Sequence, residues 1–264
     1  MAQNKESVGN TLLVAFLVCL VCAIVVSTAA VVLRPIQEEN QLMDRRINIL
    51  RAADMYERGV DVNEVFKDID MRFVDFETGE FVEGEEFNED YEHRRAARDP
   101  DKGRRLDEDP AGIRRQAKVG EVYLAWDDDG ELTRIILPVH GFGLWSTMYG
   151  FLALEADAQT IAGIGFYEHG ETPGLGGEID NPRWQANWEG KKLFDEDGEV
   201  AFEVVQGGVD SGTPDREHKV DGLSGATLTA NGVEDMVRFW VGERGFGPFL
   251  RRMQEKYAEG GATQ

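Results

Sequence analysis

The stretch Lys219-Val220-Asp221-Gly222-Leu223-Ser224-Gly225-Ala226-Thr227-Leu228-Thr229 lies directly before a segment with the apolar periodicity of a helix. The apolar side chains that share one helical face are Val233, Met236, Val237, Trp240 and Val241. Gly242 and Gly245 are expected to end this helix. The hydroxyl-rich stretch is therefore predicted to lie at a helix N-terminus, where free backbone N–H groups and the helix dipole favour an anion, phosphate above all.

The same local chemistry permits a simpler interpretation, in which Ser224 only caps the helix and Thr227 takes the third helical position. A complete capping box would carry Glu or Gln in place of Thr227. Gly225 and Ala226 have small side chains, so a phosphate can approach the backbone closely there. On these residues alone, the cap and the phosphate site both remain open.

The composition is that of a folded protein with a strongly acidic surface. The 264 residues are 42% hydrophobic and 30% charged, and the net charge is −22 at pH 7. This charge argues against binding to nucleic acid or to anionic lipid. The acidic excess otherwise indicates a well-solvated surface.

An uncharged and almost entirely apolar run at residues 11–33 follows a short tail at residues 1–10. About 20 apolar residues are enough for a helix to cross a bilayer, so we predict a transmembrane helix. The alternative is a cleaved signal peptide, with its apolar core at Leu12–Val26 and a small-residue cleavage site at Ser27-Thr28-Ala29. Because the apolar run continues to Leu33, we favour the retained helix. The flanking charges do not decide its orientation, because long domains translocate largely regardless of charge.

Both cysteines, Cys19 and Cys22, lie in this apolar run on one helical face. A C-x-x-C pair can serve redox or metal chemistry, but two thiols do not complete a four-thiolate cluster. Packing as small apolar residues is the favoured interpretation. The rest of the chain lacks thiols, which fits an exported domain.

The remainder of the chain predicts an α+β domain at residues 118–257, preceded by a helix and a charged insert at 34–117 and followed by a tail at 258–264. The helix is expected at Gln37–Tyr56. Residues 60–115 are dense in charge, and their part at 83–107 is interpreted as an exposed insert of mixed order without a site. The predicted strands are Val119–Trp126, Leu132–Val139, Thr160–Tyr167 and Val200–Gln206.

Asn181 and Pro182 are typical of a helix N-cap and first helical residue. Two glycine-rich stretches accompany them in this domain. The stretch at 140–146 approaches the dinucleotide-binding pattern, but Ser146 replaces its third glycine, which argues against a Rossmann site. The stretch at 168–177 predicts a tight, open turn, since Pro fixes one dihedral angle and Gly permits close backbone approach.

Three motifs occur in the order G-F-G-L-W at 141–145, H-G-E-T-P-G-L-G at 169–176 and D-G-L-S-G-A-T at 221–227. In this order they resemble the FMN-binding domain of membrane redox complexes, over roughly Val119–Phe249. With the single apolar run and the charged insert, they best resemble the C-subunit family of the sodium-translocating NADH:quinone oxidoreductase. The G-subunit family of the related ferredoxin:NAD (Rnf-type) complex shares the motifs and is the alternative.

The resemblance implies that an enzyme links FMN through its phosphate to Thr227, as a phosphodiester. Asp221 is the acidic residue that opens the motif, and Lys219 is a candidate to offset the phosphate charge. The residues expected to face the phosphate are Ser224, Gly225 and Ala226. The residues expected around the flavin ring, where apolar side chains suit a flat ring and polar groups suit its edge, are Trp145, Glu171, Thr172, Gly174 and Leu175.

The resemblance also implies an electron carrier without catalytic residues of its own, in a complex that oxidises NADH, reduces ubiquinone and pumps sodium ions. Expected partners are the other subunits, a flavin transferase and the lipid bilayer through residues 11–33, but no nucleic acid. The FMN-binding domain is expected on the periplasmic side of a bacterial inner membrane.

Two other functional classes stay open at this stage. One is a membrane-anchored sensory module that binds a flavin reversibly, and the other is a structural subunit with an empty site. The four histidines, His93, His140, His169 and His218, lie singly and lack the spacing of metal ligands, so no metal site is expected.

Overall fold

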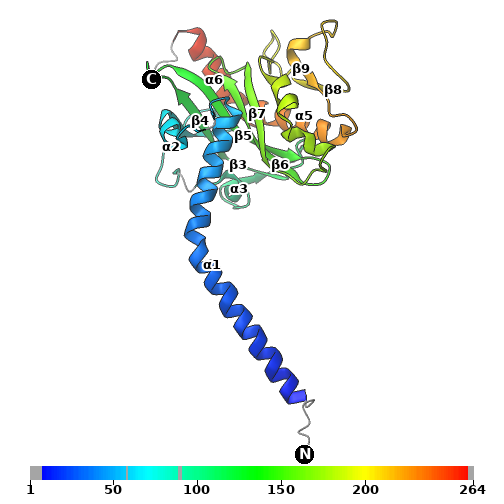
Figure 1. Ribbon diagram of the computed structural model, residues 1–264. Coiled ribbons are helices and arrows are strands. Elements are labelled where there is room, and N and C mark those ends of the chain that lie inside the picture. The colour runs from blue at the N-terminus through cyan, green and yellow to red at the C-terminus, as the bar shows by residue number, and fades with distance from the viewer. Residues whose placement is uncertain (1–7, 58, 89–90, 261–264) are drawn as a thin grey trace, which may run out of the picture. The chain divides into compact units, whose positions relative to one another are not determined.

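The computed structural model describes residues 8–57, 59–88 and 91–260. The chain forms two compact units, residues 1–45 and 46–264. All of the strands among the described residues belong to the second unit (Figure 1).

Helix α1 (Val8–Ala52) contains the predicted apolar run. Its most apolar 18-residue window has a mean hydropathy of 2.9 and is not buried within the protein. By length and composition, α1 can therefore cross a membrane. The helix predicted at Gln37–Tyr56 is confirmed as the last part of α1, although it ends at Ala52. Cys19 and Cys22 are exposed free thiols on α1.

The second unit is built on an antiparallel sheet with the strand order β1-β4-β5-β6-β7. Its strands are β1 (Ile69–Asp75), β4 (Val119–Trp126), β5 (Leu132–Phe142), β6 (Thr147–Glu155) and β7 (Ile161–Glu168). Three of them confirm predicted strands, although β5 continues to Phe142 and β7 begins at Ile161. The sequence pattern missed β6 because both faces of this strand are largely buried, which removes the alternation of apolar and polar residues.

The strand predicted at Val200–Gln206 is shorter in the structure. Only β8 (Glu203–Val205) is extended, and it pairs in parallel with β9 (Lys219–Asp221) outside the main sheet. Asn181 caps α4 (Pro182–Gln185), as predicted. The short 3₁₀ helices of this region are η2 (Gly176–Asp180), η3 (Ala186–Trp188) and η4 (Arg216–His218).

Both faces of the sheet are covered by apolar side chains. Ile135 and Leu137 of β5 point into the core shared with α5 (Thr227–Val241) and α6 (Gly247–Ala258), and Ile136 points into a second cluster on the other face. The second cluster includes Ile49, Leu50, Ala52 and Ala53. The five positions predicted for the apolar face of α5 are all buried, which confirms the predicted closing helix.

The interpretation of residues 83–107 as exposed was wrong, because Tyr91, His93, Ala96 and Ala97 are buried. The charge-dense segment at 60–115 also supplies the edge strand β1, which pairs with β4 along its whole length. Its other elements are α2 (Val62–Val65), η1 (Phe66–Asp68), α3 (His93–Ala96), β2 (Gly103–Arg105) and β3 (Arg115–Ala117). Phe73, Tyr91, Ala96 and Ala97 form a separate buried cluster, so sparse apolar residues hold a segment that is mostly charged.

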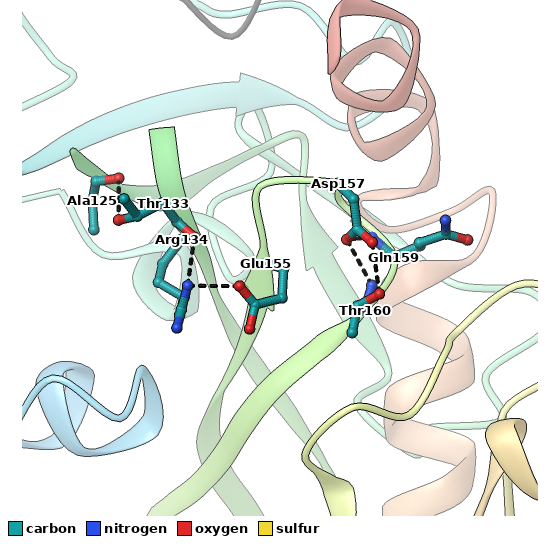
Figure 2. A network of polar contacts seen from close by, with 7 residues as sticks. All are labelled: Ala125, Thr133, Arg134, Glu155, Asp157, Gln159 and Thr160. Atoms are coloured by element: carbon teal, nitrogen blue, oxygen red, sulfur yellow. Dashed lines mark hydrogen bonds and ion pairs between the residues drawn. The ribbon is translucent and has the colours of Figure 1, made fainter. Parts of the chain in front are cut away.

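Polar contacts fix the end of the sheet where β5 begins and β6 turns into β7 (Figure 2). Arg134 Nη1 donates a 2.7 Å hydrogen bond to Glu155 Oε2 of the paired strand. In the turn, Asp157 Oδ1 accepts the N–H groups of Gln159 and Thr160, at 3.0 and 2.8 Å. The other end of β5, at Phe142, leads into the first glycine-rich motif.

Candidate functional site

Helix α5 begins at Thr227, and its N-cap is Ala226, whose side chain cannot cap. In the described residues no side chain caps this helix. Its first internal hydrogen bond runs from the Ala230 N–H to the Ala226 carbonyl, at 3.0 Å. The N–H groups of the first three helical residues therefore have no partner within the helix. The prediction that Ser224 is the cap was wrong, because a turn separates Ser224 from the helix.

That turn spans Leu223 to Ala226 and is closed by the Ala226 N–H donating to the Leu223 carbonyl, at 3.1 Å. Gly225 has a φ of 74°, a conformation that L side chains rarely adopt. Ser224, Gly225 and Thr227 are exposed, whereas Ala226 is buried. Thr227 thus lies on the surface, in the helical turn whose first N–H groups have no partner within the helix.

The third hydroxyl of the stretch has a different environment. Thr229 is only 1% exposed, and its hydroxyl donates a 2.6 Å hydrogen bond to Oε2 of Glu171. The sequence did not predict the contact between Thr229 and Glu171. The available signal was that Thr229, two residues after Thr227, belongs to a hydroxyl-rich stretch.

Glu171 is itself buried, with 5% of its surface exposed. Its Oε1 accepts the consecutive N–H groups of Leu144, Trp145 and Ser146, at 3.1, 2.9 and 3.4 Å. Burial raises the pKa of this carboxyl, but the hydrogen bonds from Thr229 and from the loop N–H groups outweigh burial and hold the pKa below its ordinary value. Glu171 is therefore a buried carboxylate that joins the first glycine-rich motif to α5.

The second glycine-rich motif forms the predicted tight turn. The Leu175 N–H donates to the Thr172 carbonyl at 3.1 Å, and Gly174 has a φ of 75°. Pro173 precedes this glycine, as in type II turns. Thr172, Gly174 and Leu175 are exposed, and Leu175 lies beside Gly225 of the other turn.

Apolar side chains are exposed on the first two motifs and on the first turn of α5. Trp145 is 66% exposed, and the others are Phe142, Leu144, Leu175 and Leu228. The Ser146 hydroxyl accepts the Gly170 N–H at 2.6 Å, which joins the first motif to the second. The site therefore combines an exposed hydroxyl, free backbone donors and exposed apolar side chains, which together suit a phosphate-bearing flat ring.

Asp221 opens the third motif, ahead of these groups, and is tied to the protein. Its Oδ1 accepts the Val209 N–H at 2.7 Å, and its backbone carbonyl accepts the Trp184 indole N–H at 2.8 Å. Lys219 Nζ lies 3.5 Å from the Glu203 carboxylate. Both residues thus have protein partners, which fix β9 ahead of the motif.

Two histidines form a buried cluster that the sequence spacing did not predict. His93 Nδ1 lies 2.7 Å from Glu121 Oε2, and His93 Nε2 lies 3.4 Å from His140 Nδ1. The indole N–H of Trp240 donates to the His140 carbonyl at 2.7 Å. Burial, followed by the neighbouring His93 and Arg94, holds the pKa of His140 well below 6.5.

His169 borders the site through the backbone of Glu171. Its Nδ1 accepts the Glu171 N–H at 3.2 Å, so Nε2 carries the ring proton and donates to Asp180 Oδ2 at 2.7 Å. Over residues 8–57, 59–88 and 91–260, no cluster of three or more His, Cys, Asp or Glu side chains could hold a metal ion.

Comparison with known proteins places this site within a described family. The FMN-binding domain family matches residues 143–242, which hold the Trp145 loop, the Thr172–Leu175 turn and α5. The C-subunit of the Na(+)-translocating NADH-quinone reductase from Vibrio campbellii is 49% identical over 97% of this chain and 98% of its own length. The protein of the same name from Pseudomonas aeruginosa is 46% identical over 96% of this chain and 98% of its own.

Solved structures agree with the sequence relatives. The crystal structure of Shewanella oneidensis NqrC matches with a TM-score of 0.75 at 35% identity, over 83% of this chain and 99% of that one. The crystal structure of the C-subunit of the Na(+)-translocating NADH-quinone reductase from Parabacteroides distasonis matches with a TM-score of 0.64 at 30% identity, over 83% of this chain and 96% of that one. The mixed α+β fold predicted from the sequence is confirmed by these similarities.

Proposed function

The chain belongs to the C-subunit family of the Na(+)-translocating NADH-quinone reductases, and on that premise we propose that it carries electrons through an FMN bound covalently to Thr227. As a member of this family it is a subunit of an oxidoreductase complex with an FMN-binding domain. The C-subunit relatives favour this role over the G-subunit of the ferredoxin:NAD complex.

The observation that carries the proposal is the exposed Thr227 at the N-terminus of α5. The N–H groups of the first helical turn and the helix dipole stabilise a phosphate at this point. Ser224 and Gly225 are exposed on the adjoining turn, and Ala226 keeps the backbone accessible through its small side chain. Formation of the phosphodiester would break the Thr227 O–H bond and form an O–P bond to the FMN phosphate, while the flavin donor used by the flavin transferase would release the group that it carries on this phosphorus.

The flavin ring requires a largely apolar border with a few polar groups. Trp145 of the first motif and Leu175 of the second are exposed, and the backbone of the Thr172–Leu175 turn offers polar groups. When bound, FMN supplies reversible uptake and release of electrons, and the protein determines its position and its reduction potential. Glu171 supports this border from within the protein.

The complex-level part of the proposal concerns partners and location. The complete complex would oxidise NADH, reduce ubiquinone and pump sodium ions, with this chain as one carrier. A flavin transferase would attach the FMN. Residues 11–33 of α1 would hold the chain in the inner membrane, with the FMN-binding domain on the periplasmic side.

The experiment that tests this function is intact-mass measurement on the full chain purified from its native host, with flavin fluorescence after denaturation. The covalent carrier retains one FMN and its fluorescence in denaturant. A sensory module that binds flavin reversibly loses the flavin in denaturant. A structural subunit contains no flavin even before denaturation. Either of these last two results contradicts the proposal.

A further inference from the structure

The buried contact between Glu171 and Thr229 joins two parts of the chain that the proposed function needs close together. Trp145 lies on the loop whose N–H groups donate to Oε1 of Glu171. Thr227 lies two residues before Thr229, whose hydroxyl donates to Oε2 of the same carboxylate at 2.6 Å. One side chain therefore connects the loop of the proposed ring site to the helical turn of the proposed attachment site.

The backbone encloses this carboxylate tightly. A Cβ atom at Gly143 would lie 2.6 Å from Oε1, and a Cβ atom at Gly176 would lie 2.7 Å from Oε2 and 2.5 Å from the Thr229 hydroxyl. Three consecutive N–H groups that converge on one oxygen form an anion-binding nest. Here the anion is supplied by the protein itself, so the carboxylate oxygens already have their partners inside the fold.

We infer that Glu171 and Thr229 are a positioning pair, which holds the Trp145 loop against the first turn of α5 and acts on FMN only through these elements. The inference rests on the proposed attachment of FMN at Thr227. It replaces the expectation that the Glu171 side chain faces the flavin ring. A carboxylate suits this task because charge-assisted hydrogen bonds are shorter and stronger than neutral ones.

Side-chain replacements separate positioning from direct contact with the ring. Glu171→Gln keeps an oxygen for the three N–H groups, and its amide can donate to the Thr229 hydroxyl. The connection between the Trp145 loop and α5 therefore persists without charge. Glu171→Ala leaves all of these donors unpaired. Thr229→Val replaces the hydroxyl by a methyl group at nearly constant volume, whereas Thr229→Ser keeps the hydroxyl.

The test compares these four variants with the wild-type full chain, using two readouts. The first is hydrogen exchange at residues 144–146 in flavin-free protein. We expect exchange at least tenfold faster in Glu171→Ala and near the wild-type rate in Glu171→Gln. The second is the initial rate at which covalent FMN appears after induction in the native host, measured by intact mass. We expect at least a tenfold loss in Glu171→Ala and Thr229→Val, with recovery in Glu171→Gln and Thr229→Ser.

Leu132→Ala controls for a general loss of stability. Leu132 is buried at the first residue of β5, whereas the first motif lies at the other end of this strand, around Phe142. It should lower the melting temperature while FMN attachment continues at the wild-type rate. If Glu171→Ala does not fold, the pair Thr229→Val and Thr229→Ser carries the same comparison.

Two results would overturn the positioning role alone. One is a wild-type rate of FMN attachment, with an unchanged flavin absorption spectrum, in both Glu171→Ala and Thr229→Val. The other is a large spectral shift in Glu171→Gln with none in Thr229→Val, which would place Glu171 at the ring. Absence of covalent FMN from the wild-type chain would instead overturn the proposed function on which the inference rests.

Discussion

Leu175 lies directly against Gly225, so that a Cβ atom at Gly225 would be 3.3 Å from Leu175 Cδ2. These residues belong to two separate glycine turns, one in the second motif and one in the motif that precedes α5. The contact brings an exposed apolar side chain next to the turn that leads to Thr227. The proposed ring site and the proposed attachment site are therefore adjacent in the fold.

Gly225→Ala should reduce covalent FMN attachment. A side chain at a φ of 74° costs about 1–2 kcal/mol, and the added methyl also presses on Leu175. The control is Gly198→Ala, where φ is 81°, an added Cβ atom would meet nothing within 4 Å, and the turn lies outside the three motifs. Both should lower the melting temperature, but only Gly225→Ala should lower the FMN content by intact mass. Equal FMN content in both variants would contradict a role for the Gly225 turn in attachment.

Gly174→Val should change the flavin's absorption or reduction potential while the covalent bond still forms. The exposed Gly174 has a φ of 75° and open space around it, so valine there distorts the turn without a steric clash. Gly190→Val is the matched control, with a φ of 73°, open surroundings and a position outside the motifs. If spectrum and potential are the same in both variants, the Thr172–Leu175 turn is only a structural element.

The sequence predicted the elements whose pattern is local. Helix α5 was predicted because Val233, Met236 and Trp240 recur at helical spacing, and the turn at Gly174 was predicted from its Pro-Gly pair. Strand β6 was missed because burial of both faces erases the strand pattern. The bond between Glu171 and Thr229 joins residues 58 positions apart, and no local periodicity could reveal it.

Protein stability should decrease as the pH falls below about 6.5, through His140. The folded-state pKa of His140 lies well below the unfolded value of 6.5, because burial and the nearby His93 and Arg94 disfavour its charged form. The unfolded chain therefore binds this proton first, and the stabilisation present above pH 6.5 is lost at up to about 1.4 kcal/mol per pH unit. Urea unfolding of wild type and His140→Phe across pH 5 to 8 measures this dependence. A curve that is equally steep without His140 would contradict the assignment.

The proposed location requires the second unit to lie outside the cytoplasm. The apolar run of α1 and the absence of thiols from the rest of the chain motivate this placement. A reporter that works only after export, fused behind Gln264, should be active, and a reporter confined to cytoplasmic function should not. Strong activity of the cytoplasmic reporter would contradict the proposed orientation and place the second unit in the cytoplasm.

Peptide mass mapping of the covalent flavin in wild type and Thr227→Ala tests the central claim most directly. Thr227 is exposed at the start of α5, Ser224 lies in the preceding turn, and Thr229 is buried against Glu171, so only Thr227 combines a free hydroxyl with the helical N–H groups. We expect the wild-type FMN on Thr227, and a folded, membrane-bound Thr227→Ala protein that lacks it, while Ser224→Ala keeps part of it. A flavin-bearing peptide from Thr227→Ala, or a wild-type adduct on Ser224 or Thr229, would contradict the account.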